Sequence, residues 1–158
     1  MEQAYIDIMI QSLKKKIDVL NCIKEQNVLQ KTYLEDPRAS VEEFDQTVDE
    51  KERLINQLDL LDSGFDKLFE RVSAELKKHK YDYANQIKIM QECIRRITDL
   101  SMEIQTQEAR NKELMIRKFA YVKASARTVR TNSKAATTYY KNMTQLHYVD
   151  PQFLDNKK

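Results

Sequence analysis

The chain has 158 residues, of which 33% are charged, one is glycine and two are proline. Sheet-rich folds, and folds that alternate strands with helices, need many tight turns, and such turns draw on glycine and proline. The composition therefore excludes these folds and predicts an all-α protein.

The charge is unevenly distributed along the chain, although the formal net charge is only +2. Residues 1–109 carry 16 Lys and Arg against 22 Asp and Glu, a net charge of −6. Residues 110–158 carry 11 against 3, a net charge of +8. This asymmetry indicates that the C-terminal third meets a different partner from the rest.

The first helix is expected over residues 3–34. Its apolar residues step by four and three, as in a coiled-coil seam, and are Ile6, Ile10, Leu13, Ile17 and Leu20. Ile23, Val28 and Leu29 continue this line. The basic run 14–16 falls between seam positions and is interpreted as a solvated face. Pro37 ends the helix because the residue before a proline is pushed out of the helical region.

The second helix is expected over residues 41–78. Ser40 and Glu43 have the spacing of a capping box, which starts it. Its apolar residues follow one heptad frame and are Val41, Phe44, Val48, Ile55, Leu58, Phe65, Phe69, Val72 and Leu76. Gly64 interrupts the helix, and we expect a bend or the close approach of another helix there.

The third helix is expected to start near Asp82, as N-cap, and to run from residue 83 to about 131. Its apolar line fades over residues 105–113, where there is little to bury. A second apolar patch follows, made of Leu114, Met115, Ile116, Phe119 and Val122. A helix over residues 83–131 would span about 70 Å, against about 48 Å for the first helix. It should outrun its companions and leave this patch exposed.

The predicted architecture is an antiparallel helical hairpin plus a long third helix, a coiled-coil-like bundle with a C-terminal extension. Residues 1–109 form the three-helix bundle, and residues 110–136 form the projecting part of the third helix. Residues 137–158 form a basic, aromatic tail that is flexible or partly ordered, and Pro151 prevents one continuous helix there.

The sequence shows no catalytic constellation and no cofactor loop, so we expect no enzyme, no cofactor and no metal. Cys22 and Cys93 match no metal-ligand spacing and are expected to be reduced thiols of a cytoplasmic protein. No apolar run approaches the ~20 residues of a membrane span. Basic residues between Arg117 and Lys141 are spread along a helix rather than clustered. They favour an acidic protein partner, or the acidic bundle itself, over nucleic acid.

The chain resembles flagellar type III export chaperones of the FlgN family. The resemblance covers most of the chain and is carried by residues 48–65, VDEKERLINQLDLLDSGF, and by the closing residues 148–158, YVDPQFLDNKK. It implies capture of hook–filament junction proteins by the C-terminal helix, prevention of premature assembly, and delivery to the export gate. The role of the tail after Pro151 stays open.

The resemblance also implies the residues that carry this function. The substrate-binding residues would be Leu114, Met115, Phe119, Val122 and Val129, and the tyrosines that could meet the export gate are Tyr121, Tyr139 and Tyr140. Two alternatives stay open: a FliT-type chaperone that serves the filament cap protein, and a structural coiled-coil adaptor that oligomerises through the same patch. A homodimer is compatible with the exposed patch.

Overall fold

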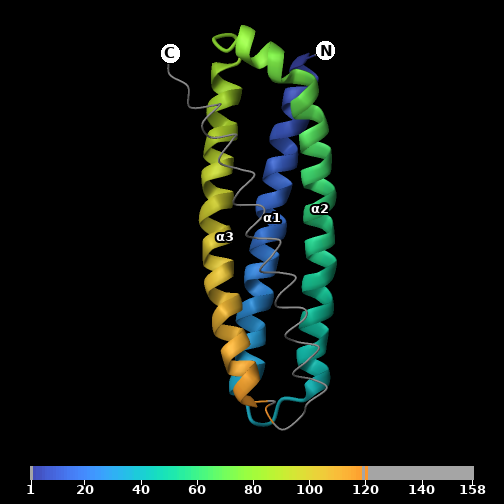
Figure 1. Ribbon diagram of the computed structural model, residues 1–158, viewed down its shortest axis with the longest axis vertical. Helices are drawn as coiled ribbons and strands as arrows, with labels where there is room; N and C mark the ends of the chain where they lie inside the picture. The colour runs from blue at the N-terminus through green and yellow to red at the C-terminus, as the bar shows by residue number, and fades with distance from the viewer. Residues whose placement is uncertain (1, 119, 121–158) are drawn as a thin grey trace.

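The computed structural model describes residues 2–118 and Ala120, and these residues form three long helices (Figure 1). The helices are α1 (Glu2–Glu35), α2 (Val41–Lys78) and α3 (Ala84–Lys118). They run side by side in one elongated bundle, with α2 antiparallel to the other two. No strand occurs in the described part of the chain. The expected all-α fold with a helical hairpin and a third helix is confirmed.

Helices α1 and α3 are parallel and in register along their whole length. Gln86 donates a hydrogen bond to Gln3 near the start of both helices, and Lys118 donates one to the Tyr33 carbonyl near the end of both. The bonded residues are 83 and 85 positions apart in sequence, so the register hardly changes between the two ends. Helix α1 packs against both α2 and α3, whereas no Cα of α2 lies within 8 Å of a Cα of α3 among the described residues.

The helix ends follow local chemistry. The Ser40 hydroxyl accepts a hydrogen bond from the Glu43 N–H, and the Glu43 carboxylate accepts one from the Ser40 N–H, which confirms the predicted capping box. Lys77 and Lys78 lie in the last turn of α2, at the negative end of its dipole. Helix α3 begins at Ala84, so the expected N-cap at Asp82 is wrong; Asp82 lies in the preceding turn.

One apolar core, which we call the main core, occupies the part of the bundle nearer the chain's N-terminus. It draws buried residues from all three helices: Ile6, Met9, Ile10, Leu13, Leu20, Ile23, Leu54, Leu58, Phe65, Val72, Leu76, Met90, Cys93, Ile94, Ile97, Leu100 and Ile104. Most residues of the seam predicted for the first helix are among them. Val28 and Leu29 are not, because they point away from both neighbouring helices and are 53% and 39% exposed.

Lys16 lies inside the bundle, and its interpretation as part of a solvated face is wrong. Its side chain is only 2% exposed, and its Nζ lies 2.5 Å from a carboxylate oxygen of Asp62 on α2. An amine can be buried when an opposite charge pairs with it. Lys16 therefore occupies a seam position of α1, and Asp62 supplies its counter-charge from α2.

Helix α2 continues without a break through Gly64. Gly64 is exposed, its backbone has no positive φ, and a Cβ placed on it would meet no atom within 4 Å. The expected close approach of another helix at this position is therefore wrong.

Helix α3 does not outrun the other two over the residues that the structure describes. It has 35 residues, against 34 in α1 and 38 in α2, and its last residue contacts the end of α1. Residues 110–118 lie against α1 and α2 rather than projecting from them. The remainder of the expected arm, residues 121–136, and the tail 137–158 lie outside the described residues. No described helix has a stretch apolar enough to span a membrane.

Candidate functional site

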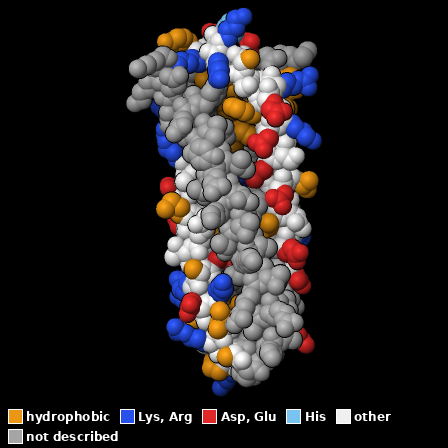
Figure 2. Space-filling view, viewed as in Figure 1, with side chains coloured by type: hydrophobic (Ala, Val, Ile, Leu, Met, Phe, Trp, Pro, Cys, Tyr) orange, Lys and Arg blue, Asp and Glu red, His pale blue; other side chains and the backbone are white. Residues whose placement is uncertain are grey.

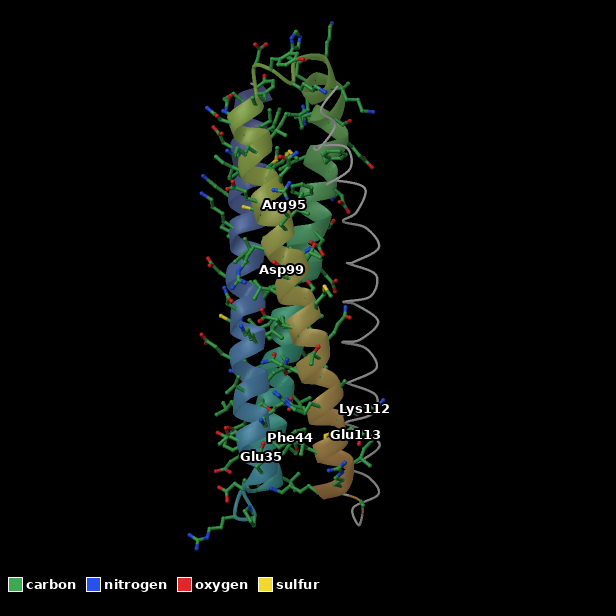
Figure 3. The ribbon with its side chains drawn as sticks, turned by 90° about the vertical axis from the view of Figure 1, so that its left-hand side faces the viewer. Glu35, Phe44, Arg95, Asp99, Lys112 and Glu113 are labelled. Atoms are coloured by element: carbon green, nitrogen blue, oxygen red, sulfur yellow. The ribbon has the colours of Figure 1, made fainter. Side chains whose placement is uncertain are left out.

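A second, smaller apolar cluster lies at the far end of the bundle, where α1 ends, α2 begins and α3 ends. We call Leu34, Phe44 and Met115 the satellite cluster; each comes from a different helix and each is buried. Val48 and Leu114 pack against it and are partly buried. Figure 3 shows Phe44 near this end, at a similar height along the bundle to Glu35 of α1 and to Lys112 and Glu113 of α3. Met115, one of the five predicted substrate-binding residues, is a member of the satellite cluster, and Leu114, a second one, packs against it.

A layer of buried polar side chains separates the satellite cluster from the main core. We call this set the polar layer: Asn27 and Gln30 of α1, Lys51 of α2, and Gln107, Glu108 and Asn111 of α3. The least buried of them, Gln107, is 9% exposed, and Asn27 is completely buried. Side chains of this kind are rarely buried unless they are paired or hydrogen-bonded. Their partners therefore decide how this part of the bundle is held.

Hydrogen bonds across the polar layer connect α3 mainly to α1. The Asn27 amide donates to Gln107 Oε1 at 3.1 Å, and the Gln107 amide donates to the Lys24 carbonyl at 3.3 Å. The Asn111 amide donates to the Asn27 carbonyl at 2.8 Å and to Gln30 Oε1 at 3.4 Å. These bonds fix the register of the two parallel helices, because sliding α3 along α1 would separate each amide from its particular partner.

An ion pair connects α3 to α2 within the same layer. Lys51 Nζ lies 2.5 Å from Glu108 Oε1 and also donates to Gln30 Oε1 at 3.3 Å. Burial lowers the pKa of Lys51, and the neighbouring Glu108 carboxylate acts in the opposite direction. A buried pair of this kind is weak support for stability, since its desolvation offsets much of its Coulomb energy.

Two buried oxygens in the polar layer have no partner. Asn27 Oδ1 and Asn111 Oδ1 are both inaccessible, and neither accepts a hydrogen bond from the described residues. A buried acceptor left without a donor costs about 1–3 kcal/mol. The hydrogen-bond network of the polar layer is therefore only partly satisfied. The main core differs, because it is held by apolar contacts.

The last turn of α3 is fastened to the C-terminal end of α1. Lys118 Nζ donates to the Tyr33 carbonyl at 2.8 Å and to the Asp36 carbonyl at 2.6 Å. Helix α1 has no basic residue in its own last turn, so Lys118 supplies a cation at the negative end of its dipole. Polar contacts therefore hold α3 at residues 107, 108, 111 and 118.

The predicted substrate-binding residues fall into two groups. Met115 is 2% exposed and Leu114 is partly buried, so in this conformation they face the satellite cluster rather than solvent. Phe119, Val122 and Val129 lie outside the described residues, and so do Tyr121, Tyr139 and Tyr140. Their part in binding stays a prediction. The pattern of apolar residues gave no reason to select Leu34 and Phe44 as the residues that cover Met115.

The outer surface of α2 is strongly acidic, and Figure 2 shows acidic side chains at intervals along it. Asp45, Asp59 and Asp66 each have a pKa raised above the usual value, first by desolvation and then by neighbouring carboxylates. Among the described residues, no group of three His, Cys, Asp or Glu side chains is arranged to hold a metal ion. Cys22 and Cys93 are both free thiols, Cys22 exposed and Cys93 buried.

The fold and the candidate site define a long α-helical bundle with two apolar clusters and a polar layer between them. The family model described as FlgN protein matches residues 1–146. The chain therefore belongs to the FlgN family of flagellar export chaperones. No curated protein and no solved structure gave a significant match.

Proposed function

We propose that this protein is a cytosolic type III export chaperone that binds hook–filament junction proteins through the C-terminal end of α3 and the residues that follow. Binding would keep these proteins from assembling before export and would deliver them to the export gate. The observation that carries the proposal is the family match, which extends to residue 146 and so includes every predicted site residue from Leu114 to Tyr140.

The physical basis of capture is the pairing of two amphipathic helices. Leu114 and Met115 lie near the C-terminal end of α3, and Phe119, Val122 and Val129 follow them in the sequence with the spacing of one apolar line. A substrate helix that laid its own apolar face on this line would bury surface that is costly to expose in water. The net charge of +8 over residues 110–158 favours a substrate segment with acidic residues beside its apolar face.

The direct test is calorimetric titration of the full chain with purified hook–filament junction proteins. A variant that ends at Ala120 keeps every described contact, including those of Met115 and Lys118, and removes Val122 and Val129. A truncation after Ala109 would also remove Asn111 and Met115 and so disturb the bundle itself. We expect the full chain to bind and the variant ending at Ala120 to bind at least tenfold more weakly; equal binding would refute the C-terminal mapping.

The two alternative functions give different results in the same experiments. Binding of the filament cap protein, with no binding of junction proteins, would indicate a FliT-type chaperone. A stable oligomer in light scattering without substrate, combined with no binding of either, would indicate a structural adaptor. A chaperone should give a one-to-one complex.

The export-gate contact is tested separately from substrate capture. Tyr121, Tyr139 and Tyr140 are each replaced by Ala, and binding to the purified gate component is measured. Tyr81 is the matched control, because it is 85% exposed and lies in the turn between α2 and α3, at the end of the bundle away from the satellite cluster. We expect one of the three variants, and not Tyr81→Ala, to lose gate binding while it retains the substrate.

A further inference from the structure

We propose that residues 107–118 of α3 open from the bundle as one unit, and that Leu34 and Phe44 cover Leu114 and Met115 in the closed state. We call this segment the latch. Leu34 and Phe44 are then autoinhibitory contacts, which a substrate helix must displace before it packs on Met115. The link to substrate rests on the proposed function, whereas the opening itself does not.

The first reason is the unequal way in which α3 is held. Between Met90 and Ile104, α3 buries six apolar residues in the main core. Beyond Ile104, Met115 is its one fully buried apolar residue among those described. Hydrophobic burial is the main force that keeps a helix in place, so the latch receives much less of it than the preceding segment.

The second reason is that water can replace the contacts that close the latch. Asn27, Gln107 and Asn111 exchange their hydrogen bonds for bonds to water when α3 moves away. Opening also hydrates the two unpartnered oxygens of Asn27 and Asn111. It hydrates the buried charges of Lys51 and Glu108, whose desolvation opposes closure. The closed state of the latch is therefore only weakly favoured over the open one.

The third reason is that the latch lies at one end of the bundle. The latch forms the last 12 residues of α3, and the apolar contacts that α3 makes up to Ile104 belong to the main core. Opening at this end leaves α1, α2 and the first part of α3 in contact. A substrate that binds only the open state has an affinity reduced by the fraction of molecules that are open, so the strength of the latch sets the affinity for substrate.

Hydrogen exchange of the free full-length chain tests the opening without any substrate. We expect amides of residues 107–118 to exchange at least tenfold faster than those of residues 94–104 under native conditions. Equal protection of the two segments would overturn the proposal, since the latch would then open only when the whole bundle unfolds.

A matched pair of variants tests whether the polar layer sets this opening. The double substitution Lys51→Met with Glu108→Leu replaces the ion pair of the latch by apolar side chains. The control, Lys16→Met with Asp62→Leu, makes the same chemical change in an ion pair outside the latch. We expect the first variant alone to slow exchange of residues 107–118 by about tenfold and to weaken substrate binding by a similar factor. The same response in both variants, or none in the first, would overturn the proposal.

Phe44→Ala should favour the open state of the latch, whereas the double variant should favour the closed state. This test does not depend on the folding of the double variant. The substitution removes the largest side chain that covers Met115. The proposal expects faster exchange in residues 107–118 together with tighter substrate binding, whereas a merely structural role predicts unchanged or weaker binding. If the exchange results agree with the proposal but neither a junction protein nor the cap protein binds, the opening stands and the chaperone function proposed above fails.

Discussion

The two ends of this bundle are built from the same three helices but are closed by different chemistry. The main core is formed by aliphatic and aromatic side chains, and one buried ion pair, Lys16–Asp62, borders it. At the other end, six polar side chains stand where the core would continue, and the satellite cluster beyond them has only three buried members. A continuous helix can therefore pass from a region held by hydrophobic burial to one held by hydrogen bonds.

The largest effect that would separate the two regions comes from breaking the ion pair of the polar layer. Lys51→Met leaves Glu108 buried without its counter-charge, at a cost of about 3–5 kcal/mol in the closed state; the free energy of unfolding at neutral pH falls by this amount or, if smaller, by the free energy needed to open the latch. Urea denaturation measures this loss. The control is Lys51→Met with Glu108→Leu, which should lie within about 1–2 kcal/mol of the unmodified protein or above it. A single variant as stable as the double one would show that the pair is not buried in solution.

A second comparison uses the same kind of truncation in both apolar clusters. Ile94→Ala empties a completely buried position in the main core, and we expect a loss of about 2–5 kcal/mol in the free energy of unfolding. Met115→Ala in the satellite cluster should fall at or below the lower limit of that range, because a cluster of three residues at the end of a bundle can relax or open. Urea denaturation of both variants checks the order. Leu60→Ala, at a position 75% exposed, is the control and should change stability by less than about 0.5 kcal/mol.

The polar layer also explains which parts of the structure could be predicted from the sequence. Fold class, the break at Pro37, the capping box and most of the main core follow from composition and from apolar spacing. Apart from Ile10, the buried positions of α1 step by three and four without interruption: Ile6, Met9, Leu13, Lys16, Leu20, Ile23, Asn27, Gln30 and Leu34. A prediction that considers only apolar residues leaves out Lys16, Asn27 and Gln30. It then assigns Val28 and Leu29 to the core, although both are exposed to solvent.

The same bias affects the end of α3. Gln107, Glu108 and Asn111 look like a stretch with little to bury, because polar side chains are usually exposed. Their spacing nevertheless continues that of Ile97, Leu100 and Ile104 on one face of the helix. Partners that make their burial possible come from α1 and α2, which lie about 60 to 80 residues earlier in the chain. Spacing could have found these positions, whereas their partners could be found only from the packed structure.

A smaller effect tests whether the start of α2 contributes to the weaker end of the bundle. Ser40→Ala removes the acceptor for the Glu43 N–H, and we expect a loss of about 1 kcal/mol in the free energy of unfolding. Ser40→Gly should cost only a few tenths of a kcal/mol, because glycine is also tolerated at N-caps. Thermal unfolding followed by circular dichroism distinguishes the two. Equal losses in both variants would show that the backbone conformation of residue 40, and not its hydroxyl, starts the helix.

The smallest expected effect concerns the acidic surface beside the main core. Asp59 and Asp66 have raised pKa values because of desolvation and the nearby Asp62. A folded-state pKa above the unfolded one means that the folded protein binds more protons, so this contribution to stability is present at low pH and is lost as the pH rises through the folded pKa. Asp66→Asn should therefore stabilise the protein by about 0.2–0.5 kcal/mol at pH 7 and at low salt. The gain should disappear below about pH 3.5, where the carboxyl is protonated in both states, and should diminish at 1 M salt. Urea denaturation at the two pH values measures it, and a gain that persists at low pH would show that repulsion between carboxylates is not its cause.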